Sequence, residues 1–455
     1  MAAFWSAAAQ IAAKMDRIRA AEAKLLKLAR EFGDREAFKY KINAYDTRIS
    51  SQNIPLKNGS NREEKELVIH AVRVQNVTSR EDNNNQSSPS TREKIPLVMQ
   101  HGYMNAAAYF YRNLVGLSHH FDDIYSLDML GWGLSSRPDF ELEGEDECEA
   151  GEKFFVESLE AWREANNIPK MILAGHSFGG YMACAYCEKY PERVERLILL
   201  SPVGVPEETT DTVERRAAMR QASWRFWAFT GVAQNVFQYH SAGKVLRSMP
   251  EKWGVNLWTN YVEKRLPAIS DPEEQAAISE YLYANNTLPG SGEYCLNKVL
   301  TPFAYAKNPM EFRIPHLKVK SVAFLYGQHD WMDSTGGTAV QLRCTNLQQQ
   351  KVPAPEVEVY ELSQAGHLLM LENWQEFNAA VILGAGGSQK DLPSQWSLPT
   401  KLDPSNFVKD QEEAWSRQRG QHVIQHREDT SSLSSTEEVS NSNGSAATAS
   451  PQLSN

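Results

Sequence analysis

Three residues that can act together on an ester bond stand at the ends of separate apolar runs. Ser177 lies within the pentapeptide Gly-His-Ser-Phe-Gly, and Asp330 and His367 each follow a later run. Glycines on both sides of a serine permit the tight strand-to-helix turn that lifts its hydroxyl above a sheet. A histidine then accepts the serine proton, and a carboxylate fixes the tautomer of the histidine. The chain order Ser, Asp, His therefore predicts a nucleophile, its supporting acid and its general base.

Other acidic and imidazole groups compete for two of these roles. Asp333 is the alternative acid, because it follows the same apolar run at a distance of only a few residues. His101, His176 and His329 are weaker candidates for the base, since none of them follows the last apolar run of the chain. His176 is expected to pack beside the serine turn.

An earlier loop is expected to complete the reaction centre. The sequence His-Gly-Tyr-Met follows the apolar run 95–100 and begins at His101. Where a serine stands on such a turn, the oxyanion is held by the N–H of the next residue and by an N–H from an earlier strand-end loop. Phe178 supplies the first of these groups, and Tyr103 is the expected second donor.

The elements that must position these residues alternate between strands and helices. Buried strands are predicted near 95–100, 123–130, 171–176, 194–200, 319–326 and 356–362, with helical spacing between several of them. This alternation predicts an α/β fold, specifically the α/β-hydrolase fold: a mainly parallel sheet flanked by helices. The core is expected to consist of two parts, residues 65–202 and 311–385.

A helical lid is predicted between the two parts of the core, at residues 203–310. This segment is rich in large aromatic residues, and it interrupts the sheet before the last two strands. An insertion at the carboxyl ends of strands lies where ligands bind and can close over them. The aromatic residues are expected either to form the lid's own core or to line an acyl-chain tunnel; they include Trp224, Trp227, Trp253 and Trp258.

Both ends of the chain are expected to lie outside the catalytic core. Residues 1–50 are predicted to be an N-terminal amphipathic helical segment, which either lies in a lipid headgroup region or packs on the protein. A mitochondrial transit peptide is a third interpretation of the same segment. Residues 386–455 are predicted to be mostly disordered, because their Ser, Asn, Thr and Glu content offers little apolar area to bury.

Composition narrows the possible partners and the compartment. The 455 residues carry a net charge of −10, which argues against nucleic acid as a partner. Five widely spaced cysteines make no disulfide framework and fit a reducing compartment. Cys184 and Cys187 are interpreted as helix packing residues rather than metal ligands. No run reaches the ~20 apolar residues of a membrane span, so a cytoplasmic protein, peripheral on membranes or lipid droplets, is expected.

Several motifs resemble one subfamily of α/β hydrolases. It contains the N-acylphospholipid lysophospholipase, the lipid-droplet lipase co-activator, the fungal cardiolipin deacylase and a plant lysophosphatidate acyltransferase with phospholipase activity. The matching stretches span most of residues 20–385. They include Leu130-Gly-Trp-Gly, Gly175-His-Ser-Phe-Gly, Tyr326-Gly-Gln-His-Asp-Trp-Met and Gly366-His. The co-activator branch has lost the nucleophilic serine, whereas Ser177 is present here.

The resemblance also implies a residue for acyl transfer. Members of the subfamily carry a His-x4-Asp motif that is linked to this activity. In this chain the motif begins at His367 and ends at Glu372, a carboxylate one methylene longer. Glu372 is therefore a possible but altered acyltransferase residue.

These features favour a serine hydrolase that cleaves acyl esters of phospholipids or lysophospholipids through an acyl-enzyme. Neither a cofactor nor a metal is expected. One alternative is an acyltransferase that moves an acyl group from acyl-CoA to lysophosphatidate. Another is a lipid-surface regulator of a partner lipase.

Overall fold

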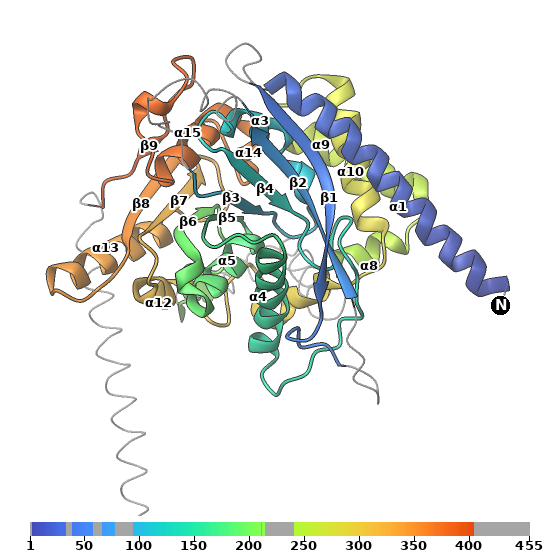
Figure 1. The fold of residues 1–455 in the computed structure, drawn as a ribbon, viewed down its shortest axis with the longest axis horizontal. Coiled ribbons are helices and arrows are strands. Elements are labelled where there is room, and N and C mark those ends of the chain that lie inside the picture. The colour runs from blue at the N-terminus through green and yellow to red at the C-terminus, as the bar shows by residue number, and fades with distance from the viewer. Residues whose placement is uncertain are drawn as a thin grey trace, which may run out of the picture. The chain divides into compact units, whose positions relative to one another are not determined.

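The computed structural model describes residues 2–32, 39–57, 66–77, 94–210, 212–213 and 241–404, with the backbone alone for 2–7. Within these ranges nine strands form one sheet, in the order β1-β2-β4-β3-β5-β6-β7-β8-β9 (Figure 1). Strands β3 to β8 are parallel to one another, and β1, β2 and β9 are antiparallel to their neighbours. The predicted fold class is confirmed. The strands are β1 Tyr40–Ser50, β2 Glu66–Asn76, β3 Leu97–Gln100, β4 Asp123–Leu127, β5 Met171–His176, β6 Val194–Leu200, β7 Ser321–Gly327, β8 Glu356–Leu362 and β9 Thr400–Lys401.

The central strands are apolar throughout because both faces of the sheet are covered. In β5, Met171 and Leu173 join the core on one face, and Ile172 and Ala174 join the core on the other. Side chains alternate between the two faces of a strand, so a strand between two helical layers reads as a continuous apolar run. One layer contains α4 Glu147–Ala165, α5 Phe178–Lys189 and α13 Thr335–Gln349; the other contains α1 Ala2–Ala29, α3 Tyr111–Leu117 and α15 Trp374–Gly384 (Figure 1).

Helix α5 also settles the interpretation of the two closely spaced cysteines. Cys184 and Cys187 are buried in α5 and form no disulfide. Burial raises the pKa of both thiols well above the ordinary value. Both cysteines are therefore packing residues, as predicted.

Between β6 and β7, where the sequence predicts a lid, the described residues form helices. These helices are α8 Ala242–Arg247, α9 Glu251–Arg265, α10 Pro272–Thr287 and α11 Leu296–Val299, with the short α12 Met310–Arg313 leading back to the sheet. Asp271 begins α10 by accepting the N–H of Glu274, with Pro272 in the first turn. Trp258 is buried, whereas Trp253 is 67% exposed. Trp224 and Trp227 lie outside the described residues.

The N-terminal segment differs from the single helical unit that was predicted for residues 1–50. Helix α1 ends at Ala29, and residues 40–50 form the edge strand β1, which pairs with β2 along its whole length. Intermediate and exposed positions alternate along much of β1, which is the period of a strand rather than of a helix. The helical spacing of the sequence runs from Phe4 to Leu28 and agrees with α1, but the segment boundary at residue 50 also took in this strand.

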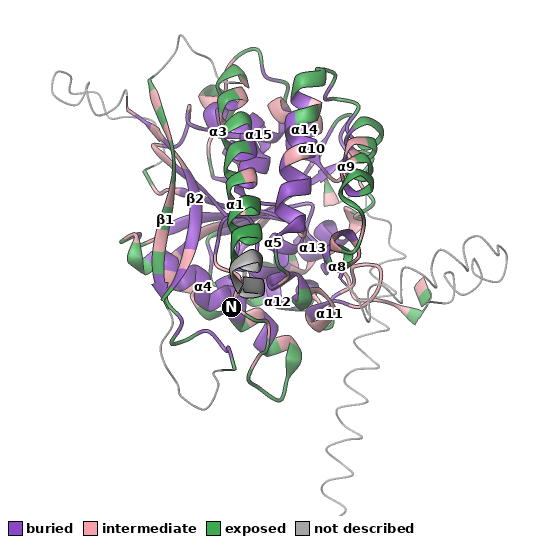
Figure 2. Cartoon of the chain, turned by 90° about the vertical axis from the view of Figure 1, so that its right-hand side faces the viewer, coloured by how far each residue is buried: buried purple, intermediate pink, exposed green. Residues whose placement is uncertain are grey.

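Helix α1 packs on the protein over only part of its length. Ile18 and Leu25 are fully buried, and Arg17 donates to Glu280 of α10 at 2.5 Å. Residues 8–13, in contrast, are all exposed (Figure 2). The core-packing interpretation therefore holds for the second half of the helix.

Part of the segment predicted to be disordered is ordered. Trp396 is 8% exposed and packs edge-on against Trp374, and Thr400–Lys401 adds a short strand to β8. A single tryptophan in a polar stretch supplies enough apolar area to fix this part of the chain. Residues 405–455 lie outside the described ranges.

Candidate active site

Ser177 stands at the turn between β5 and α5. Its backbone has φ 53° and ψ −116°, a strained conformation, and its N–H donates to the carbonyl of Leu200 at 2.9 Å. The flanking glycines are required by space: a Cβ on Gly175 would lie 2.4 Å from the carbonyl oxygen of Gly179, and a Cβ on Gly179 would lie 2.4 Å from that of His101. The local sequence thus forces the hydroxyl out above the carboxyl end of the sheet.

Asp330 and His367 reach the same place from the ends of β7 and β8. His367 Nε2 lies 3.1 Å from Ser177 Oγ, and His367 Nδ1 lies 3.1 Å from Asp330 Oδ1. Burial alone raises the pKa of Asp330, but hydrogen bonds from His367, Ser201 and the N–H of Met332 lower it overall. The carboxylate therefore stays ionised and holds a proton on Nδ1, which leaves Nε2 free to accept the serine proton.

Ser201 is a residue of this centre that the sequence interpretation missed. It follows β6, is fully buried, and has a positive φ of 46°. Its hydroxyl donates to Asp330 Oδ2 and lies 2.8 Å from His367 Nδ1. The signal was present in the sequence: a polar residue ends a buried inner strand, which is the same pattern that pointed to Asp330.

The competing candidates have other partners. Asp333 accepts the N–H of Thr335 at 2.9 Å, at the start of α13. His101 is buried and donates from Nδ1 to the carbonyl of Gly102 at 2.7 Å. The carbonyl of Ala365 accepts the backbone N–H of His329. None of the three contacts Ser177 among the described interactions.

His176 packs beside the turn, as expected. It donates from Nε2 to the carbonyl of His367 at 2.9 Å, and so supports the backbone of the base. Burial, with the nearby His367, lowers the pKa of His176 to about 3. His176 is therefore a neutral neighbour of the reaction centre.

The His101–Met104 loop lies directly against the serine turn. A Cβ on Gly102 would lie 3.1 Å from Ser177 Cβ, and the rings of Tyr103 and Phe178 meet edge to face with centroids 6.5 Å apart. Within the described part of the chain, neither the Tyr103 N–H nor the Phe178 N–H donates to a protein acceptor. Both groups thus remain available to an oxyanion.

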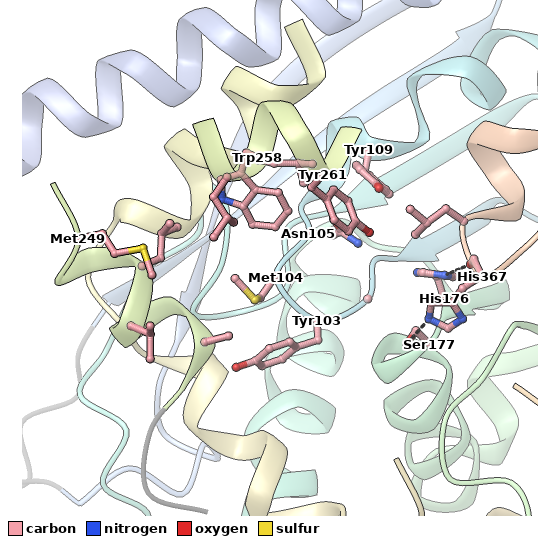
Figure 3. A pocket seen from close by; sticks show the side chains of 17 residues that line it. Tyr103, Met104, Asn105, Tyr109, His176, Ser177, Met249, Trp258, Tyr261 and His367 are labelled. Carbon is pink, nitrogen blue, oxygen red and sulfur yellow. Dashed lines mark hydrogen bonds between the residues drawn. The ribbon is translucent and has the colours of Figure 1, made fainter. Parts of the chain in front are cut away.

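A cavity of about 470 Å³ opens from Ser177 toward the lid (Figure 3). Its floor is formed by the serine turn and the His101–Met104 loop, and its roof by α8, α9 and α10. Most of its lining is apolar or aromatic: Met104, Val245, Leu246, Met249, Leu257, Trp258, Leu282 and Leu368. A lining of this kind suits a hydrocarbon chain placed next to the nucleophile.

The α/β hydrolase fold family model matches residues 95–373, which include the serine turn, the lid and both later loops. The chain belongs to the α/β-hydrolase fold family. Ser177, Asp330 and His367 lie just past the carboxyl ends of the parallel strands β5, β7 and β8.

Several relatives of this α/β hydrolase are named for activities on lipids. It is 34% identical to the probable 1-acylglycerol-3-phosphate O-acyltransferase of Oryza sativa subsp. japonica, over 64% of this chain and 67% of the relative. It is also 34% identical to the (lyso)-N-acylphosphatidylethanolamine lipase of Mus musculus, over 65% of this chain and 80% of the relative. The 1-acylglycerol-3-phosphate O-acyltransferase ABHD5 of Sus scrofa is 31% identical to this chain, over 65% of this chain and 78% of the relative.

Glu372 of this α/β hydrolase lies behind the base rather than in the cavity. Its carboxylate accepts the backbone N–H of Gly366, the residue before His367. Burial raises the pKa of Glu372, although that hydrogen bond opposes the shift. Glu372 is not among the residues that line the described cavity. Its contact therefore holds the turn that carries the base.

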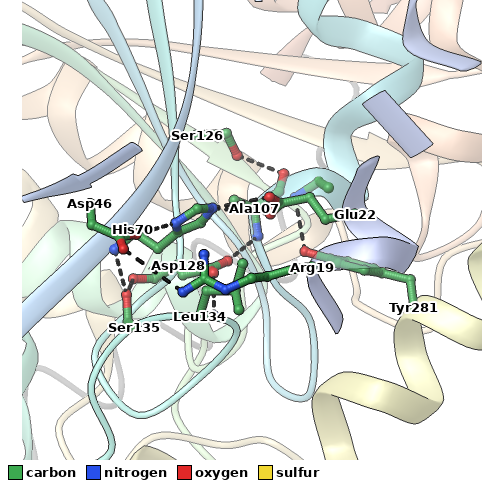
Figure 4. A network of polar contacts seen from close by, with 11 residues as sticks. Arg19, Glu22, Asp46, His70, Ala107, Ser126, Asp128, Leu134, Ser135 and Tyr281 are labelled. Atoms are coloured by element: carbon green, nitrogen blue, oxygen red, sulfur yellow. Dashed lines mark hydrogen bonds and ion pairs between the residues drawn. The ribbon is translucent and has the colours of Figure 1, made fainter. Parts of the chain in front are cut away.

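A second group of ionisable residues lies where α1, β1, β2 and the end of β4 meet (Figure 4). Potential ligand atoms of Glu22, His70 and Asp128 lie within 4.8 Å of one another, which is the spacing of a metal site. These atoms already have protein partners, however. His70 Nδ1 lies 2.6 Å from Asp46 Oδ1, and His70 Nε2 lies 3.1 Å from Glu22 Oε1. The two oxygens of Asp128 accept the backbone N–H groups of Ala107 and Leu134. The group is an ion cluster that connects α1 to the sheet.

No helix among the described residues of this α/β hydrolase has both the length and the apolar composition to cross a bilayer.

Proposed function

We propose that this protein is a serine hydrolase that cleaves acyl ester bonds of phospholipids or lysophospholipids through an acyl-enzyme. The observation that carries the proposal is the hydrogen-bonded chain Ser177–His367–Asp330 at the floor of an apolar cavity. The relative named as a (lyso)-N-acylphosphatidylethanolamine lipase supports the lipid substrate class.

The proposed reaction uses the contacts of Ser177, His367 and Asp330 in two stages, acylation of the serine and hydrolysis of the acyl-enzyme. His367 Nε2 takes the proton of Ser177 as Oγ attacks the ester carbonyl, and Asp330 stabilises the imidazolium that forms. The N–H groups of Tyr103 and Phe178 bind the negative oxygen of the tetrahedral intermediate. The imidazolium returns its proton to the departing lipid alcohol. Water, activated in the same way, then releases the fatty acid from the acyl-enzyme.

The test uses the full-length protein, a fluorophosphonate probe and a labelled lysophospholipid. The wild type is expected to take the label at Ser177 and to release free fatty acid. Ser177→Ala should remove labelling and lower turnover by roughly 10⁴-fold or more, because nucleophile and base act as a unit. Ser388→Ala, at an exposed serine, serves as the control. Full labelling of the Ser177→Ala protein would show that the nucleophile lies elsewhere.

A second candidate function is acyl transfer from acyl-CoA to lysophosphatidate. The relatives named 1-acylglycerol-3-phosphate acyltransferases favour it. In such a reaction lysophosphatidate replaces water as the acceptor of the Ser177 acyl group. The position of Glu372 does not add to this candidate, because the carboxylate holds the Gly366 backbone instead of facing the cavity.

Both candidates are separated by one incubation of the protein with acyl-CoA and labelled lysophosphatidate. Accumulation of phosphatidate supports transfer, and accumulation of free fatty acid supports hydrolysis. The lipid-surface regulator is a third candidate, and the presence of the Ser177 triad makes it the least supported of the three.

We also propose that the protein acts at the periphery of membranes or lipid droplets. The exposed stretch 8–13 of α1 and the exposed Trp253 on the lid support this proposal.

A further inference from the structure

Three polar side chains face the Ser177 cavity without a partner in the described part of the protein: Asn105, Tyr109 and Tyr261. Asn105 is 8% exposed and Tyr109 is 2% exposed. Figure 3 shows the Asn105 amide and the two phenol groups on the side of the cavity between Trp258 and His367. Neither the side-chain amide nor either hydroxyl makes a described hydrogen bond to protein.

The absence of hydrogen-bond partners at these positions is shared with the hydroxyl of the buried Tyr326, but it differs from several other tyrosines of the molecule. Other buried tyrosines are engaged: Tyr111 bonds to Glu274, Tyr186 to Glu160, and Tyr281 accepts the N–H of Ala108. Even Tyr103, which lines the same cavity, interacts with the backbone of Ala242. Because all three groups face the cavity and have no described protein partner, they are free to hydrogen-bond to a ligand that enters it.

The three groups lie close to the reacting atoms. Asn105 is on the loop whose Gly102 lies against Ser177, and its backbone is fixed there by Gly102 and Asn285. Burial raises the pKa of the Tyr109 and Tyr261 hydroxyls, and both lie near enough to Glu372 for its charge to raise that pKa further. Glu372 in turn binds the backbone of Gly366, the residue before His367. A ligand group bound here is therefore near the ester that Ser177 attacks.

Charge restricts what this ligand group is. No Asp, Glu, Lys or Arg is among the described residues that line the cavity. An ionised phosphate would lose its hydration there without gaining a cation, which is costly. A neutral group that both donates and accepts suits an amide and two phenols far better. An alcohol hydroxyl has this chemistry.

The size of the cavity favours a lipid with one chain. A volume of about 470 Å³ lies in the lower half of the usual range of ligand pockets, ~300–1,000 Å³. A second acyl chain beside the first would also press its methylenes against the three polar groups and leave them unsatisfied. A lipid with a free hydroxyl in place of the second ester avoids both costs.

We propose that Asn105, Tyr109 and Tyr261 form a subsite for the free hydroxyl of a monoacyl glycerolipid, on the carbon next to the ester that Ser177 attacks. The inference rests on the proposed ester hydrolysis and adds the feature of the substrate that the enzyme selects. Asn105 offers two N–H donors and one acceptor, and each phenol can donate or accept.

The test compares two substrates on one enzyme preparation. One is 1-palmitoyl-lysophosphatidylcholine, and the other is its 2-deoxy analogue, which has the same ester and headgroup without the hydroxyl. The wild type should favour the hydroxyl substrate about tenfold or more in kcat/KM, because the analogue leaves buried groups unpaired. Asn105→Leu, Tyr109→Phe and Tyr261→Phe should each bring the ratio toward one, mainly through the hydroxyl substrate.

The ratio of the two substrates cancels any loss of folded enzyme in a variant. Tyr283→Phe is the matched control, because Tyr283 packs against Arg17 outside the cavity lining and should leave the ratio unchanged. Equal kcat/KM for both lipids in the wild type would overturn the proposed subsite. A ratio of the two kcat/KM values that stays unchanged in all three variants would do the same, and neither result would affect the proposed hydrolysis. Failure of the wild type to hydrolyse either lipid and p-nitrophenyl butyrate would overturn the proposed function instead.

Discussion

At the scale of single residues, Ser201 links the acid to the base. Its hydroxyl contacts Asp330 on one side and His367 Nδ1 on the other, so it fixes the orientation of both groups. Ser201 is not among the described residues that line the cavity, so we treat it as a positioning residue. Its hydrogen bond is also one of the causes that lower the pKa of Asp330.

Ser201→Ala is expected to lower kcat about 10- to 100-fold with little change in KM, because orientation of the base is lost while the cavity is intact. The pKa of Asp330 should rise when it loses a hydrogen-bond donor. The loss of activity that follows protonation of Asp330 at low pH should therefore begin at a higher pH in the variant. The profile of kcat against pH for a soluble ester measures both effects.

Ser201→Gly is the control, because it removes the same hydroxyl but relieves the positive φ of 46°. Equal losses in the two variants would assign the effect to the hydroxyl. Full activity in the glycine variant would instead assign it to backbone geometry.

At the scale of elements, the ion cluster holds α1 against the sheet. His70 on β2 lies between Asp46 of β1 and Glu22 of α1. Burial alone lowers the pKa of His70, but the hydrogen bond with Glu22, the charge of Asp128 and the contact with Asp46 raise it overall to about 9. The imidazole is therefore protonated at neutral pH and joins three elements electrostatically.

A raised pKa in the folded state fixes the direction of the pH dependence. The stabilisation from His70 is complete below its unfolded pKa of ~6.5 and is lost as pH rises through about 9. His70→Asn should lower the free energy of unfolding by roughly 2–3 kcal/mol near pH 6.5 and flatten its dependence on pH between 6.5 and 9. Denaturant unfolding at several pH values measures this, with the exposed His316→Gln as control. A slope that persists in His70→Asn would place the titrating group elsewhere.

At the scale of the whole molecule, the second half of α1 is bound to the protein, whereas residues 8–13 are exposed. Lys14 donates to the carbonyl of Thr287 at 2.9 Å, and Ile18 is the first fully buried side chain among residues 8–29. Residues 8–13 lie beyond these contacts and are exposed. A lipid surface can therefore take up the first turns of α1 without disturbing the docked half.

Deletion of residues 2–12 is expected to weaken binding to liposomes several-fold and to leave hydrolysis of a short soluble ester unchanged, because the deleted turns lie outside the docked half. Liposome flotation measures the binding. Unaltered flotation would show that membranes are contacted elsewhere, for example by the lid.

The parts that were predictable from sequence are those with local signals. The inner strands read as continuous apolar runs, and the serine turn, Asp330 and His367 each end one of them. Strand β1 was missed because an edge strand buries little of its surface. The contact partners of Ser201 and the unpartnered state of Asn105 depend on residues more than a hundred positions away, and no local pattern carries that information.

The docking of α1 on α10 also has a consequence for synthesis. Arg17 and its partner Glu280 are 263 positions apart in the sequence. Helix α1 therefore cannot dock until the ribosome has synthesised α10. At a synthesis rate of ~5–20 residues per second, the delay between the synthesis of Arg17 and that of Glu280 is on the order of tens of seconds. Throughout it, the apolar stripe that includes Ile18, Ala21 and Leu25 has no native partner on α10. We therefore expect the nascent chain to expose an apolar helix to which a chaperone can bind.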